Sequence, residues 1–474
     1  MQNVKKQYGL WTGIAMVVGI VIGSGVFIKA GGVLQAAGGN LTISLLAWLV
    51  GGIIMVTSGF CFAIFATRVT KYNGVVDYVE VATNKRFGYD LAWLITTFYY
   101  PIIASIVSIM SAKYFLELFG ITYNFGDFAN EDLKWLLFLL AFLLLSFFVV
   151  MNYLSPRIAA KFQISATIIK LIPIVVIAVV GVFAAIILKN GELGILNAFS
   201  NAALNSDGKA YVSNFGEAVV TTSFAYEGWV CATSINAELK DSKRNLPKAL
   251  TFGTIVIVLF YLIYFISLSA CLGNSGVIAA GSSAPIEVFE KIMGGVGKAI
   301  FTIFIMISCL GTVNGVTMSC CRGMYTMSCR GQGICPEKFA KLGKNESVSL
   351  LSCIYGYCCM LFMLLIWYLA LSGIGPFKYL GAMDEIICAI IYGAYITMYV
   401  YIMKNFKDAN IFQRYIMPIL AIIGSLFFVI CGTGIFQIVS NGDWGRLTQF
   451  AVFMILLLIL MIPSVFFYRE KNNK

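Results

Sequence analysis

Hydrophobic residues follow one another in long runs along almost the whole chain, and short polar stretches separate these runs. A run of about 20 apolar residues is long enough to cross the hydrocarbon core of a bilayer as a helix. We therefore expect an all-α integral membrane protein. The pattern predicts twelve membrane-spanning helices, at residues 10–37, 41–67, 89–119, 133–153, 158–188, 213–238, 247–272, 296–328, 349–371, 378–403, 415–439 and 446–468.

Composition and charge agree with this class and indicate an orientation. The chain is 60% hydrophobic and only 12% charged, yet its formal net charge is +11. An even number of spans places both termini on one side. The short loops on that side hold most of the lysines and arginines, for example Arg68, Lys85, Arg157 and Lys404. The positive-inside rule then places both termini in the cytoplasm of a multi-pass protein of the cell membrane. The net charge reflects topology and anionic lipid, and no nucleic-acid partner is expected.

The residue inventory excludes several kinds of chemistry. The chain has no histidine, which removes the commonest general base and the Ser-His-Asp and Cys-His nucleophile systems. No GxxxxGK[ST] phosphate loop occurs. The 13 cysteines lie almost wholly in or beside the predicted spans, where they read as packing residues. We expect no catalytic residues, no metal site and no cofactor, and hence not an enzyme.

Two predicted spans contain stretches that are poorly suited to a continuous helix in lipid. The first reads "VVGIVIGSGVFIKAGG" and places two glycines around Ser24. The sixth reads "SFAYEGWV" and places the carboxylate of Glu227 beside Gly228. Each stretch can also be explained by helix packing alone. Gly19 and Gly23 form a GxxxG packing pattern, and Glu227 can pair with a neighbouring helix. Interrupted helices at matching positions of two halves are nevertheless the best sequence indication of a transporter binding site.

Such a pair of breaks suits a zwitterion. A helix that restarts near Val26 presents free N–H groups and a positive dipole end, which attract a carboxylate. A break near Phe224–Tyr226 exposes backbone carbonyls, which attract an ammonium group. An α-amino acid carries both charges at a suitable separation.

The same two stretches resemble a known family. "IGSGVFIKAGGVL" resembles the first-helix motif of the amino acid–polyamine–organocation superfamily, and "FAYEGWVCATSINAELKDSKRNLPKAL" resembles the sixth-helix signature of its L-amino acid transporter branch, nearest to bacterial serine/threonine exchangers. The resemblance runs from about residue 8 to 465. It implies one transporter domain over residues 1–474 with a LeuT-type fold: a first five-helix repeat (8–190), an inverted second repeat (213–404), two peripheral helices (414–468), and first and sixth helices that are unwound.

The resemblance also implies roles for individual residues. It places the substrate carboxylate at the first break and the amino group at the sixth-helix break, with Tyr100 and Asn314 lining the pocket. The implied substrate-binding residues are Gly23, Ser24, Gly25, Val26, Tyr100, Phe224, Ala225, Tyr226, Glu227, Gly228 and Asn314. Relatives often have proline where this chain has Ala30, which leaves the geometry after the first break less defined.

Lys170 lies deep in the fifth predicted span. In the family, a lysine there takes the place that sodium occupies in sodium-coupled relatives, so the resemblance implies sodium-independent transport with Lys170 as the coupling residue. Two alternatives remain: Lys170 reaches cytoplasmic headgroups, or it pairs with Glu227. Desolvation lowers the pKa of a buried lysine, so coupling to protons also stays open.

The leading hypothesis is a sodium-independent exchanger of neutral L-amino acids, with serine and threonine as the nearest substrates, that works by alternating access. The alternative is a proton-coupled or exchange transporter of cationic amino acids or polyamines, because Glu227 can attract a positive side chain. A membrane sensor is a third class, without an appended signalling domain to support it. The expected partners are the amino acid and the bilayer, with no disulfide-linked heavy chain, because the loop between the third and fourth spans lacks cysteine.

Overall fold

The computed structural model describes residues 9–69, 74–121, 131–187, 193–205, 208–209, 211–230, 240–342 and 348–468. These residues form helices, and the one extended pairing among them is an isolated antiparallel bridge between Ala37 and Ser213. The α-helices are α1 (Leu10–Val21), α2 (Gly25–Ala36), α3 (Leu41–Arg68), α4 (Val75–Ala82), α5 (Lys85–Leu94), α6 (Tyr100–Leu118), α7 (Glu131–Leu154), α8 (Pro156–Ile187), α9 (Ile195–Ser200), α10 (Phe215–Ala225), α11 (Ser242–Ala280), α12 (Ala284–Cys329), α13 (Pro336–Phe339), α14 (Leu350–Leu371), α15 (Met383–Asn405), α16 (Met417–Thr433), α17 (Ile435–Asn441) and α18 (Gly445–Phe467). The π-helical turns Ile95–Tyr99 and Phe412–Ile416 precede α6 and α16, and Gly281–Ser283 and Gly375–Leu380 are 3₁₀ turns.

Nine helical stretches within these described ranges are long and apolar enough to cross a membrane. The difference from the twelve predicted spans has three sources. The first predicted span is present as two 12-residue helices, α1 and α2. The described part of the sixth contains only the 11-residue α10. The seventh and eighth lie in one helical stretch, residues 244–329, which is kinked at Gly273 and Gly294.

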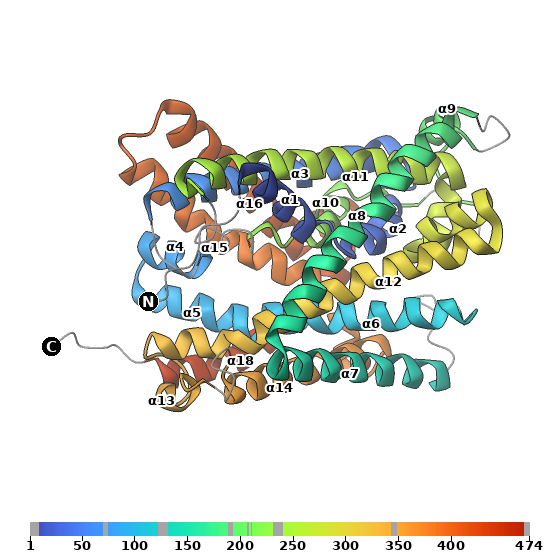
Figure 1. The fold of residues 1–474 in the computed structure, drawn as a ribbon. Helices are drawn as coiled ribbons and strands as arrows, with labels where there is room; N and C mark the ends of the chain where they lie inside the picture. The colour runs from blue at the N-terminus through green and yellow to red at the C-terminus, as the bar shows by residue number, and fades with distance from the viewer. Residues whose placement is uncertain are drawn as a thin grey trace. The chain divides into compact units, whose positions relative to one another are not determined.

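The first of two packing units comprises residues 1–78, 168–305 and 388–444. Its centre is α3 packed along α11, with α1 and α2 also against α11 (Figure 1). Small residues permit these close crossings. A Cβ added to Gly253 on α11 would lie 2.8 Å from Val17 of α1, and one added to Gly424 on α16 would lie 2.7 Å from Ile54 of α3. Glycine at such points lets backbones approach, which is how helices associate where lipid provides no hydrophobic drive.

The second unit comprises residues 79–167, 306–387 and 445–474. Here α6, α7 and α14 pack on one another, and α5 packs on α18. A buried ion pair ties the start of α18 to the start of α15: Arg446 Nη2 lies 2.8 Å from Glu385 Oε2, and each side chain is 8% exposed. Removing one partner of such a pair leaves a buried charge uncompensated, so this contact fixes how the two helices begin.

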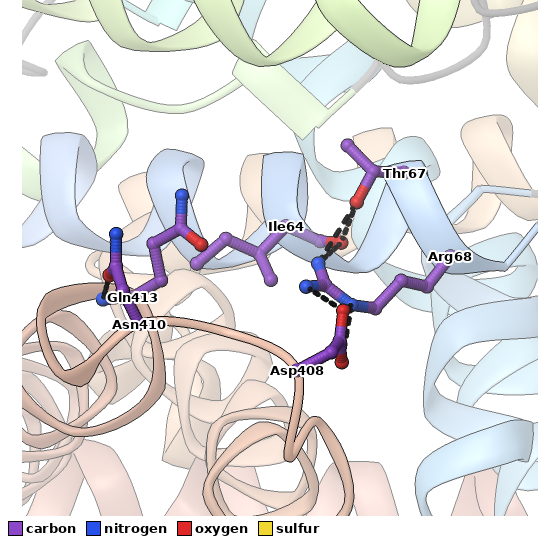
Figure 2. Close-up of polar contacts among 6 residues, drawn as sticks. All are labelled: Ile64, Thr67, Arg68, Asp408, Asn410 and Gln413. Atoms are coloured by element: carbon purple, nitrogen blue, oxygen red, sulfur yellow. Dashed lines mark hydrogen bonds and ion pairs between the residues drawn. The ribbon is translucent and has the colours of Figure 1, made fainter.

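An exposed ion pair holds the last residue of α3, within the first unit (Figure 2). Arg68 donates from Nη2 to Asp408 Oδ2 at 2.7 Å and from Nε to the same oxygen at 3.2 Å. Its guanidinium also lies 4.8 Å from the ring centre of Phe406. Asp408 belongs to the connection between α15 and α16, and the Asn410 side chain next to it caps the following turn by accepting from Gln413 N at 2.8 Å. The end of α3 is thus bound to a connection 340 residues further along the chain.

Candidate binding site

The first break lies between α1 and α2. The chain leaves helical geometry at Ile22, where ψ is 100°, and α2 begins at Gly25 after Ser24 as its N-cap. The Ser24 side chain makes no capping hydrogen bond, and Ile28 N donates to Ser24 O at 3.0 Å as the first full helical bond. The amides of Gly25 and Val26 precede that bond, so they have no acceptor within the helix. These N–H groups, at the positive end of the helix dipole, favour an anion.

The second break follows α10. This helix ends at Ala225, Tyr226 leaves helical geometry with ψ near 3°, and Gly228 has φ of +101°. Only glycine adopts such a positive φ without steric cost, so Gly228 sets the direction in which the chain leaves the helix. The remainder of the predicted sixth span, residues 231–239, lies outside the described residues.

Gly25 brings the two breaks together. A Cβ added to Gly25 would lie 2.7 Å from Ala225 Cα and 3.2 Å from the Phe224 carbonyl oxygen. The N-terminal end of α2 and the C-terminal end of α10 are therefore in backbone contact inside the first unit. A negative and a positive group bound there would meet N–H donors and carbonyl acceptors respectively.

Tyr261 on α11 contacts both breaks, a role that the sequence does not indicate. Its hydroxyl lies 3.3 Å from the carbonyl oxygen of Val21, the last residue of α1, and 3.1 Å from that of Ala225, the last residue of α10. A hydroxyl has one proton to donate, so the two carbonyls share it. One buried side chain therefore holds the carbonyl ends of both interrupted helices.

The side chain of Tyr226 is directed away from this contact. Its hydroxyl donates to Trp48 O at 2.8 Å, and its ring packs edge-on against the Trp48 ring with centroids 5.6 Å apart. Gly51 and Gly52 of α3 leave room for it, because a Cβ on either would lie 3.2 Å from tyrosine atoms. Only the backbone of Tyr226 therefore lies near the break.

The other predicted residues of the two breaks differ in exposure. Ser24, Val26, Phe224 and Ala225 are buried, and Glu227 and Gly228 are half-buried. Their carbonyl and amide groups, rather than long polar side chains, make up most of what the breaks present. The substrate-binding assignment of these residues stays a prediction.

Asn314 and Tyr100 belong to the second unit. The Asn314 amide already has several partners there. Nδ2 donates to Ala159 O at 3.1 Å and to Gln163 Oε1 at 2.9 Å, and Oδ1 accepts from Asn152 Nδ2 at 3.0 Å. Fully buried, this amide ties α12 to α7 and α8, and its assignment to the substrate pocket stays a prediction. Tyr100 is the first residue of α6 and is half-buried.

Lys170 is 2% exposed and lies in the part of α8 that belongs to the first unit. A buried lysine at membrane depth is costly and marks a functional position by default. Its coupling role stays a prediction.

A cavity of about 400 Å³ in the second unit has a different character. Trp93, Tyr355, Phe362 and Leu460 are among the residues that line it, and no charged side chain does. No charged side chain in this lining could pair with either charge of a zwitterion. Among the described residues, no group of three or more Cys, Asp or Glu side chains is arranged to hold a metal ion.

Spanning helices around two facing helix breaks define a multi-pass membrane protein with the organisation of a transporter. A family model described as amino acid permease matches residues 8–462, and the chain belongs to this family, within the amino acid–polyamine–organocation superfamily.

Individual relatives are transporters and exchangers rather than enzymes. The serine/threonine exchanger SteT of Bacillus subtilis is 29% identical over 447 residues, which cover 93% of this chain and 94% of that protein. The large neutral amino acids transporter small subunit 2 of mouse is 28% identical over 66% of this chain and 56% of its own length. The human cystine/glutamate transporter is 23% identical over 69% of this chain and 62% of its own length.

Proposed function

We propose that this protein is a sodium-independent exchanger of small neutral L-amino acids, serine and threonine first among them, working by alternating access in the cell membrane. The observation that carries the proposal is the backbone contact at Gly25, where the N-terminal end of α2 meets the C-terminal end of α10. The match to a serine/threonine exchanger along almost the whole of both chains supports the substrate class.

In this proposal the substrate carboxylate accepts hydrogen bonds from the amides of Gly25 and Val26. The ammonium group donates to the carbonyl end of α10, at Phe224 and Ala225. Tyr261 keeps the Ala225 carbonyl in place. The backbone approach at Gly25 leaves no room for a side chain, so the two half-sites stay within reach of one small molecule.

The wider architecture belongs to the same proposal: twelve spans in two inverted repeats plus two peripheral helices, interrupted at the first and sixth, with both termini in the cytoplasm. Lys170 supplies a fixed cation where sodium-coupled relatives bind an ion, and its burial supports that role. No heavy-chain subunit is needed for transport.

The test uses purified full-length protein in liposomes loaded with unlabelled serine. Labelled serine uptake is followed without sodium, with and without internal amino acid, and with an imposed proton gradient. Uptake that requires internal serine and ignores both ions supports the proposal. Proton-driven uptake into empty liposomes replaces exchange by symport, and absence of serine flux in every condition refutes the substrate class.

A cationic substrate is the second candidate, and Glu227 is the observation that favours it. This carboxylate is half-buried and directly follows the second break, where a positive side chain would meet it. Glu227→Gln separates the two functions: loss of arginine or ornithine uptake with serine uptake intact supports the cationic function, whereas equal effects on both reject it.

A further inference from the structure

The apolar cavity of the second unit lies between helices that are expected to cross the membrane. Its volume of about 400 Å³ is within the range of pockets that hold a small molecule. Its walls come mainly from α5, α14 and α18, each part of a stretch that is long and apolar enough to span a bilayer. Helix α18 packs on α5, and α14 packs on the π-helical turn that continues α5. The cavity includes no residue of the two helix breaks.

The polar side chains in the wall bond to the wall itself. Thr97 Oγ1 and Tyr355 Oη share a hydrogen bond at 3.2 Å, and Trp93 Nε1 donates to Leu460 O at 3.4 Å. The other lining residues are aliphatic, aromatic or sulfur-containing: Ile334, Cys358, Cys359, Phe362, Met363, Pro463 and Phe467. A buried water makes about three hydrogen bonds, so a wall whose polar groups are already engaged suits hydrocarbon better than water.

The cavity opens to the lipid-facing surface of the unit. Cys358 and Phe362, which line it, are both exposed on α14. On α18, Ile459 and Ile462 are 56% and 54% exposed, and each directly precedes a lining residue. In a bilayer such exposed apolar side chains contact acyl chains, because these make up the hydrocarbon core. Acyl chains therefore lie next to the opening.

Aromatic rings mark the depth of the cavity. Trp93 stacks on Phe467, the last residue of α18, with ring centroids 6.2 Å apart. Tyr89 contacts Tyr468 at 5.3 Å, and the Arg86 guanidinium lies 4.6 Å from the Tyr468 ring. Tryptophan, tyrosine and a cation gathered at helix ends are typical of the membrane–water interface. Trp93 is seven residues after Arg86, about 10 Å along the helix, so the cavity begins just inside the interface.

We propose that the cavity between α5, α14 and α18 binds one acyl chain of a bilayer phospholipid. The chain enters past Cys358 and Phe362 and packs on the rings of Trp93 and Phe467. The headgroup stays at the level of Arg86, so that the polar and apolar parts of the lipid each keep a suitable environment. Because the surrounding lipid is already apolar, the preference for the site comes from close packing rather than from the hydrophobic effect.

The test uses full-length protein in liposomes that contain a phospholipid with a photoreactive diazirine on its acyl chain. After illumination, the labelled residues are mapped by mass spectrometry of peptides. The lining residues Met363 and Leu460 are compared with Ile455 and Leu458, which are 59% and 60% exposed on α18 and lie outside the cavity. We expect the lining residues to be labelled at least about tenfold more, which corresponds to about 1.4 kcal/mol in favour of the site.

A pair of tryptophan variants tests whether the cavity causes the enrichment. Cys358→Trp places a large ring at the opening and is expected to reduce labelling of Met363 and Leu460 to the level of Ile455. Leu365→Trp is the matched control, because Leu365 is 52% exposed on the same helix outside the lining, and it leaves the enrichment unchanged.

The labelling does not require transport, so its failure leaves the proposed function standing. Equal labelling of lining and lipid-facing residues in wild-type protein overturns the inference. An enrichment that Cys358→Trp does not reduce also overturns it, because the acyl chain then lies outside the cavity. The wild-type distribution decides the matter even where the Cys358 variant fails to fold.

Discussion

One methyl group at Gly25 tests the geometry of the proposed site. In Gly25→Ala the new Cβ lies 2.7 Å from Ala225 Cα, whereas ordinary contact begins at 3.4 Å, so α2 and α10 must separate locally by roughly 0.7 Å. The two nearest obstructing atoms, Ala225 Cα and the Phe224 carbonyl oxygen, belong to the backbone and cannot rotate aside. Overpacking of this kind costs about 1–3 kcal/mol of stability. Misplacing a binding constellation by about 1 Å costs about 100-fold in rate. We therefore expect serine exchange to fall by about 100-fold.

The assay is the initial rate of labelled serine exchange across a range of serine concentrations, with equal amounts of reconstituted protein. Gly32→Ala is the matched control, because it makes the same substitution in the same helix and its Cβ would meet Thr221 Cγ2 at 3.6 Å, an ordinary contact. The control is expected to exchange serine at nearly the wild-type rate. If Gly25→Ala retains exchange within about threefold of the wild type, the close backbone approach is not what holds the carboxylate, and the reasoning is wrong.

Three further predictions concern single side chains. Tyr261→Phe keeps the ring and removes the shared hydrogen bond, so we expect a loss of about 1 kcal/mol in stability and slower exchange; an unchanged Tm and rate would show that the hydroxyl does not hold the helix ends. Lys170→Ala is expected to abolish exchange while membrane protein levels stay normal, and wild-type rates at every pH would remove Lys170 from the mechanism. The hydrogen bond from Arg68 lowers the pKa of Asp408, so the pair stabilises the fold above the ordinary aspartate pKa of about 4 and loses this effect as the pH falls through the lowered value. Asp408→Asn should therefore lower Tm slightly at pH 7 and progressively less below pH 4, and a Tm difference that does not shrink in acid would contradict the ion pair.

The two helix breaks could be predicted from short stretches of the sequence. Glycines around Ser24 and a carboxylate beside Gly228 are unfavourable within an apolar span, and each marks its position without knowledge of the fold. Tyr261 carries no such signal, because tyrosine is common in the apolar helices of this chain and nothing near it in sequence is unusual.

The direction in which a side chain points could not be predicted from the residues next to it in the sequence. Tyr226 is next to the second break, yet its ring enters a space left by two glycines of α3, 174 and 175 positions earlier in the chain. The Asn314 amide forms hydrogen bonds with Asn152, Ala159 and Gln163 of two other helices, and nothing near Asn314 in the sequence indicates these partners. In both cases long-range partners decide where the polar atom goes. Membrane spans are easier to predict from the sequence, because their length and apolarity alone define them.

The two ends of the proposed site differ in how completely the protein satisfies them by itself. At α10, the Ala225 carbonyl already accepts from Tyr261, and the Phe224 carbonyl lies 3.4 Å from the amide of Glu227. At α2, Ser24 provides no side-chain cap. The N-terminal end of α2 is therefore the less completely satisfied of the two. Under the proposed function, we expect the substrate carboxylate to contribute more to binding than the ammonium group.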